Sequence, residues 1–181
     1  YLSDNNIADA PYDNPPAPVI DGQIAPGEYA GAGKITFPGF DGDVEVFFKE
    51  DGAYLYVAFD VPARKTGPSN CTTLYFDTDL DGDNQIDPND YMLRICDSGI
   101  TQEYTTTLGG PWTQVIHPSG WTGDHWINPT GGGWQSEYRI EYTKLGLTAG
   151  AFQEIGLAAT TVDNDVHYWP TGAYHTQPRT W

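Results

Sequence analysis

The residues best suited to chemistry are six aspartates within fourteen positions of the chain. They stand in the stretch DTDLDGDNQIDPND, at Asp77, Asp79, Asp81, Asp83, Asp87 and Asp90. The first four alternate with single residues and Gly82 follows the third, which is the spacing of the first half of an EF-hand calcium loop. Calcium needs several oxygens at about 2.3–2.6 Å, and a glycine turn folds short carboxylates inward around it. The stretch therefore predicts a calcium site.

The second half of this stretch departs from the EF-hand pattern. Position 12 is Pro88, where a bidentate glutamate normally stands, so Asp87 or Asp90 would have to close the coordination sphere. The alternative is a solvated acidic turn without a metal. Asp163 and Asp165 form another oxygen cluster that could hold a second cation, although such clusters are more often plain turns.

Both flanks of the acidic stretch have the sequence of β-strands, which predicts a hairpin instead of two helices. Residues 71–77 and 90–96 pair antiparallel when the first and last aspartates face each other, and apolar residues then meet on one face. In this register the only two cysteines of the chain, Cys71 and Cys96, stand directly opposite each other. We expect a cross-strand disulfide, with two free thiols as the alternative. A disulfide would place the protein outside a reducing cytosol.

Length and composition favour one all-β domain. The 181 residues include 21 glycines, 14 prolines and 14% aromatic residues, which is typical of many short strands joined by turns. The net charge of −17 disfavours nucleic acid and anionic membranes as partners, and is compatible with divalent cations and neutral sugars. No apolar run approaches the ~20 residues of a membrane span. The chain begins at Tyr1 instead of Met, so we expect either a processed mature form or an excised piece, in both cases of a secreted, extracellular protein.

The chain divides into an extended arm at residues 1–17 and a β-sandwich domain at residues 18–181. The arm is polar and rich in proline and would be disordered unless it docks. Its apolar members could dock on their own domain or on a neighbouring copy; they are Tyr1, Leu2, Ile7 and Tyr12. Asn70 begins the tripeptide Asn-Cys-Thr, which fits the N-glycosylation pattern.

Alternation of apolar and polar residues locates the strands of the domain. It predicts strands at residues 19–20, 43–48, 53–60, 100–107, 134–142 and 154–162, in addition to the hairpin around the acidic stretch. We therefore expect an antiparallel, jelly-roll-like β-sandwich. Residues 109–134 are rich in glycine and should be loops. Their tryptophans could form a platform on which sugar rings stack, or could simply cover the ends of the core; they are Trp112, Trp121, Trp126 and Trp134.

The order of these features resembles the secreted β-sandwich superfamily that includes family 9 carbohydrate-binding modules and the related DOMON domains. The matching pieces are VIDG at 19–22, YLYVAFD at 54–60, LYFDTD at 74–79 with DYMLR at 90–94, EYRIEYTKLGL at 137–147, and IGL at 155–157 leading to DND at 163–165. The resemblance covers about residues 18–170 and implies a jelly-roll-like sandwich, bound calcium and a non-catalytic module. It leaves residues 1–17 and 109–134 unexplained.

Some relatives bind haem through methionine and a histidine or lysine. Here the sole methionine, Met92, shares a strand face with Arg94 and the expected disulfide, which is a poor setting for an iron ligand. A haem domain is therefore a remote alternative.

No catalytic pattern stands out. The four histidines lack the spacing of a zinc site, and there is no nucleophile elbow, phosphate loop or dinucleotide fingerprint; the histidines are His117, His125, His167 and His175. We expect a protein that is not an enzyme. The first hypothesis is a calcium-stabilised extracellular structural or adhesive subunit that self-assembles, its arm adding a strand to a neighbour's sheet. The alternative is a carbohydrate-binding module that targets polysaccharide.

Overall fold

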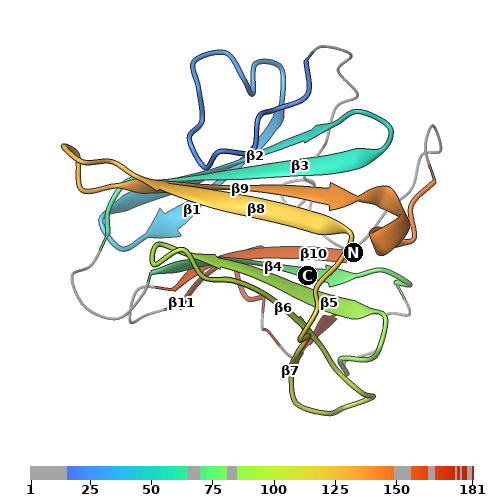
Figure 1. The fold of residues 1–181 in the computed structure, drawn as a ribbon. Coiled ribbons are helices and arrows are strands. Elements are labelled where there is room, and N and C mark those ends of the chain that lie inside the picture. Colours follow the sequence, from blue (N-terminus) through green and yellow to red (C-terminus); the bar gives the residue numbers. More distant parts are fainter. Residues whose placement is uncertain are drawn as a thin grey trace.

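The computed structural model of the chain describes residues 16–64, 70–80, 85–148, 156–162, 166–173, 175, 177–178 and 181. Two antiparallel sheets face each other (Figure 1). Sheet A has the strand order β1 (Gly33–Gly39), β2 (Gly42–Glu50), β3 (Tyr54–Val61), β9 (Trp134–Glu141), β8 (Trp121–Ile127). Sheet B has the order β11 (Val166–Trp169), β10 (Gly156–Val162), β4 (Cys71–Asp77), β5 (Asp90–Cys96), β6 (Thr101–Thr105), β7 (Thr113–Gln114). The predicted all-β sandwich is confirmed.

The core lies between the sheets because alternate residues of each strand point to the same side. β3 sends Leu55, Val57 and Phe59 inward, and β9 pairs with it so that Tyr138 and Ile140 lie on the same side. The opposing layer comes from sheet B and includes Leu74, Phe76, Leu93 and Ile95. A short 3₁₀ helix, η2 (Tyr142–Leu145), follows β9 where the sequence predicts a turn or a helical turn. Among the described residues, no helix is long and apolar enough to cross a lipid bilayer.

One predicted loop contains a long strand. Within residues 109–134, β8 pairs with β9 along its whole length and forms an edge of sheet A. The glycine that makes this segment look like a loop, Gly123, is required by packing. A Cβ at that position would stand 2.4 Å from Cδ1 of Ile95 in the opposite sheet and 2.8 Å from the backbone oxygen of Glu137. The prediction of a loop was therefore wrong for residues 121–127.

Two smaller differences concern the ends of the predicted strands. The opening strand expected at residues 19–20 is not formed; this part of the chain is a loop that crosses the outer face of sheet A. β6 ends at Thr105, two residues earlier than predicted. The predicted arm, with Tyr1, Leu2, Ile7 and Tyr12, lies outside the described residues except for its last two positions.

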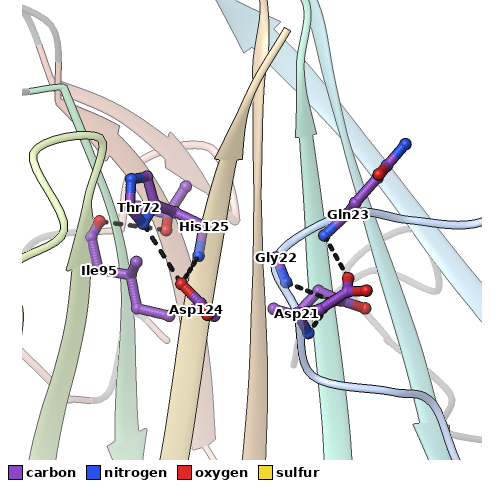
Figure 2. Close-up of polar contacts among 8 residues, drawn as sticks. Asp21, Gly22, Gln23, Thr72, Ile95, Asp124 and His125 are labelled. Atoms are coloured by element: carbon purple, nitrogen blue, oxygen red, sulfur yellow. Dashed lines mark hydrogen bonds and ion pairs between the residues drawn. The ribbon is translucent and has the colours of Figure 1, made fainter.

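The loop of residues 17–32, here called the N-terminal strap, is held by a buried carboxylate of β9. Glu137 Oε2 accepts hydrogen bonds from the backbone nitrogens of Asp21 (3.2 Å) and Gly22 (2.9 Å), and its Oε1 accepts one from the Tyr29 hydroxyl (3.1 Å). Burial, and secondly the charge of Glu28, raises the pKa of Glu137 to about 7. Figure 2 shows Asp21, Gly22 and Gln23 on one side of sheet A. The VIDG motif thus anchors the strap to the sheet.

A buried ion pair ties the two sheets together at the β8 edge. Lys144 Nζ of η2 lies 2.8 Å from Glu103 Oε1 of β6, and both side chains are almost entirely buried. Trp121 Nε1 of β8 donates to the other oxygen of Glu103 at 2.8 Å. The Lys144 ammonium also stands 4.7 Å from the centre of the Tyr91 ring. Because the charges satisfy each other, this polar cluster can sit at the margin of the core.

Candidate functional site

The hairpin around the acidic stretch has the register expected from the sequence. β4 pairs with β5 from Cys71 opposite Cys96 to Asp77 opposite Asp90. Cys71 and Cys96 form a disulfide, and no free cysteine is left in the chain. The predicted disulfide is confirmed, so the two strands are joined covalently at the end far from the acidic loop.

The carboxylates at the mouth of this hairpin are buried and close together. Asp77 and Asp90 are 3% and 2% exposed. Asp77 Oδ1 accepts a hydrogen bond from the backbone nitrogen of Leu80 at 2.7 Å. Asp90 Oδ2 accepts one from the backbone nitrogen of Asp87, also at 2.7 Å. Burial, and then the charges of Asp77, Asp87 and Asp79, raises the pKa of Asp90 to about 7. Burial is the main cause of this rise, and the neighbouring carboxylates add to it.

The structure describes only some of the residues that were predicted to bind a metal. In the part of the chain that the structure describes, no three acidic, histidine or cysteine side chains converge closely enough to hold a metal ion. Asp81 and Asp83 of the first predicted site, and Asp163 and Asp165 of the second, lie outside the described residues. The oxygen chemistry of Asp77, Asp79, Asp87 and Asp90 suits calcium.

The four predicted tryptophans do not form one platform. Trp134 is 1% exposed and belongs to the core between the sheets. Trp121 packs against that core, its ring stacked on Tyr138 with 6.0 Å between centroids. The Trp134 ring cannot stack on a sugar because it is buried, and Trp121 already has Tyr138 stacked on its ring. Trp126 lines a hollow of about 100 Å³ on the side of sheet A, together with residues that include Asp60, Asn128 and Gln135.

Trp112 lies elsewhere, on the outer face of sheet B. It stacks on Trp181 with 6.4 Å between ring centroids, and both contact Tyr75 of β4 at 6.0 and 5.5 Å. The Trp112 indole nitrogen donates to the His175 backbone oxygen at 3.0 Å. Trp112 and Trp181 therefore lie over Tyr75, which is 4% exposed. Local sequence patterns do not predict this contact, because Trp112 and Trp181 are distant in the chain.

The outer face of sheet B also holds a polar site, here called the Arg94 patch: Arg94, Gln102, Tyr104 and Gln114. In register, Met92 of β5 opposes Tyr104 of β6, Tyr104 opposes Gln114 of β7, and Arg94 opposes Gln102. All four members face away from the core. Gln102 Nε2 lies 3.4 Å from Gln114 Oε1, which links the two amides.

Arg94 is held in place by its neighbours. Its Nε donates to Thr73 Oγ1 of β4 at 3.3 Å, and Thr73 is fully buried. One terminal nitrogen lies 3.8 Å from Met92 Sδ, and the guanidinium carbon stands 5.5 Å from the centre of the Tyr104 ring. Burial raises the pKa of Tyr75 to about 12, and the positive charge of Arg94 acts against that rise. The result is a half-exposed, oriented fork of donors above an aromatic ring.

Sequence reasoning missed the Arg94 patch, although the expected register contained its signal. That register already placed Tyr75 opposite Met92 and Thr73 opposite Arg94 on the face away from the core. The contact of Met92 sulfur with Arg94, and its burial among aromatic rings, agree with the expectation that it is a poor haem ligand.

Asn70, the predicted glycosylation site, is buried, and its amide nitrogen donates a hydrogen bond to Asp97 at 2.7 Å. A glycan at Asn70 would have to displace this bond.

The comparisons with known proteins concern the fold. No protein-family model and no curated protein sequence matches the chain. A carbohydrate-binding module of family 9 from Caldicellulosiruptor kristjanssonii, in complex with cellotriose, resembles it with a TM-score of 0.62 at 14% identity, over 94% of this chain and 89% of that one. Such a module from the same organism, in complex with glucose, gives a TM-score of 0.61 at 13% identity, over 95% and 92%. The chain has the fold of these modules. Nothing in the comparisons supports the DOMON alternative.

Proposed function

We propose that this chain is a non-catalytic, extracellular carbohydrate-binding module whose ligand contacts the Arg94 patch. The observation that carries the proposal is the guanidinium of Arg94, fixed by buried Thr73 and lying over the Tyr104 ring with two amide side chains beside it. Sugar hydroxyls need oriented donors and acceptors next to an apolar surface, and this patch offers both. The fold shared with modules seen in complex with cellotriose and glucose supports the proposal. The disulfide supports the extracellular location.

A glycan panel tests this function. Wild-type protein should be retarded in native gels that contain its polysaccharide, and should bind the matching oligosaccharide in calorimetry. Tyr104→Ala should weaken binding roughly tenfold, because it removes the aromatic surface of the patch. Tyr54→Ala is the matched control, because Tyr54 lies on sheet A and also has an arginine over its ring: the guanidinium carbon of Arg139 is 5.0 Å from the ring centre. Absence of retardation by every soluble and insoluble glycan tried would reject the function.

A self-assembling structural subunit is the second candidate. It is favoured by the edges of sheet A, because β1 and β8 each pair with one neighbour only in the described chain. Open edges of this kind accept an added strand from another copy, and residues 1–17 could supply it. Electron microscopy and light scattering with calcium, and then with chelator, would compare the full chain with one that lacks residues 1–17. A dispersed monomer under every condition would exclude this candidate.

We also propose that the acidic hairpin binds calcium, with Asp77, Asp79, Asp87 and Asp90 among its ligands and Asp81 and Asp83 completing the set. The support is the burial of Asp77 and Asp90, which are 3% and 2% exposed and stand opposite each other at the mouth of the hairpin. Calcium at about 100-fold excess over its Kd should raise the free energy of unfolding by about 2.7 kcal/mol. Asp90→Asn should abolish the difference in Tm between calcium and chelator, and the exposed Asp43→Asn should keep it. An identical Tm for the wild type in calcium and in chelator would count against the site.

A further inference from the structure

Among the described residues, the groups that the guanidinium of Arg94 contacts are neutral. They include the hydroxyl of Thr73, the sulfur of Met92 and the ring of Tyr104. Lys34, Arg64 and Lys144, by contrast, each pair with a carboxylate. Among the described residues, no carboxylate lies within 4.0 Å of Arg94. Within the described residues, Arg94 and Arg139 thus lack a carboxylate within 4.0 Å, in a chain that has 25 acidic and 8 basic residues.

The carboxylates of the strands are distributed unequally between the two outer faces. Sheet A presents six on its outer face: Asp43, Glu45, Asp60, Asp124, Glu137 and Glu141. On the strands of sheet B, the outward-facing described residues include only Asp77 and Asp90, both at the acidic loop. Asp90 is four residues from Arg94 along β5, which is roughly 13 Å and beyond the Debye length at physiological salt. Among the described strand residues of sheet B, the outward-facing carboxylates thus lie at the acidic end of the hairpin, away from Arg94.

We infer that the Arg94 patch binds an acidic sugar, and that the carboxylate of a hexuronate residue is the group that meets the Arg94 guanidinium. This inference rests on the proposed function and narrows its ligand class. A planar guanidinium matches a carboxylate with two parallel hydrogen bonds. Gln102 and Gln114, next to it, can bond the hydroxyls of the same or the adjoining sugar. Tyr104 supplies the flat apolar surface beneath.

Calorimetry with three short oligosaccharides tests the inference. Trigalacturonate, trimannuronate and cellotriose are titrated into the full chain at fixed calcium concentration. We expect at least one acidic trimer to bind at least about tenfold more tightly than cellotriose, because hydrogen bonds between charged groups are stronger than neutral ones. The preference should fall when sodium chloride is raised, as charge pairing is screened.

Three variants locate the effect. Arg94→Gln should lower affinity for the acidic trimer roughly 10- to 100-fold and leave cellotriose nearly unchanged. Arg94→Lys keeps the charge but loses the planar fork, so it should give an intermediate loss. Arg139→Gln is the matched control, because Arg139 also lies over a tyrosine, at 5.0 Å, on the acidic sheet A; it should bind as the wild type does. Thermal unfolding of each variant checks that it is folded.

The outcomes separate this inference from the proposed function. The inference is overturned if cellotriose binds more tightly than both acidic trimers. It is also overturned if Arg94→Gln still prefers an acidic trimer to cellotriose. Either result leaves the carbohydrate-binding function standing. Binding of none of the three trimers, and of no polysaccharide in the panel above, overturns both.

Discussion

Gly22 of the N-terminal strap lies against the main chain of His125 in β8. A Cβ built on Gly22 would stand 2.2 Å from the carbonyl carbon of His125 and 2.5 Å from its Cα and nitrogen. Figure 2 shows Gly22 on the strap and His125 on β8. Only glycine permits this approach, and it also accepts the φ of +82° found there. The glycine of VIDG is therefore a packing requirement.

This contact predicts the effect of a single methyl group. Gly22→Ala should lower the free energy of unfolding by roughly 3 kcal/mol, because the added Cβ collides with backbone that cannot move aside. Gly27→Ala, at φ +86° with nothing within 4 Å of its added Cβ, should lose only about 1 kcal/mol. Urea denaturation compares the two. Equal losses would show that φ alone, and not the contact with His125, makes glycine necessary.

The second prediction concerns pH and Glu137. Its pKa rises from 4.5 in the unfolded chain to about 7 in the fold, so the folded state favours the protonated carboxyl. The stability that this group contributes is complete below about pH 4.5 and is lost as the pH rises through 7. Between these values the wild type should lose up to about 3 kcal/mol relative to Glu137→Gln, which does not titrate. Chemical denaturation of both proteins at each pH provides the comparison, and parallel curves would contradict the shift.

The third prediction concerns the buried pair of Glu103 and Lys144. Lys144→Met leaves the Glu103 charge buried without its cation and should destabilise the protein by about 3–5 kcal/mol. In the double variant Lys144→Met/Glu103→Gln the charge is gone, and the glutamine can still accept the hydrogen bond from Trp121. The double variant should therefore be more stable than Lys144→Met alone. A double-mutant cycle measures this, and additive losses would mean that the two side chains do not act together.

The fourth prediction concerns the disulfide. Cys71→Ser/Cys96→Ser opens a loop defined by a sequence separation of 25 residues, and should lower stability by about 3 kcal/mol through the freedom that the unfolded chain regains. The Tm of the double variant is compared with that of the oxidised and of the reduced wild type. Reduction should lower the Tm of the wild type by about as much as the double substitution does. A variant as stable as the oxidised protein would contradict this.

The hairpin of β4 and β5 could be predicted residue by residue because three independent signals agree there. Apolar residues alternate on both strands, the aspartates mark the turn, and only one register brings Cys71 opposite Cys96. The hairpin of β2 and β3 was equally clear from its alternation and from the turn at residues 51–52. Such local agreement between pattern and turn chemistry fixes a strand pair without knowledge of the rest of the fold.

The parts that the sequence did not predict depend on contacts between distant segments. Gly123 weakens the strand pattern of β8, and its reason lies in Ile95 on the other sheet. Trp134 and Trp121 look like exposed loop tryptophans until the pairing of β8 with β9 turns them to the core. The Arg94 patch combines three strands, and the aromatic cover beside it requires Trp181 from the end of the chain. No local pattern records these relationships.

The disulfide between Cys71 and Cys96 also bears on how the chain reaches its fold. A slip of one residue between β4 and β5 would turn Leu74 or Leu93 outward and bring Arg94 into the interior. Once the cysteines are joined, Cys71 and Cys96 stay next to each other even when the chain unfolds, and pairing that starts beside the bond begins in the native register. An oxidised molecule that unfolds therefore keeps the alignment of β4 and β5 at one end, and the strand face that carries Arg94 can re-form without a new search for the register.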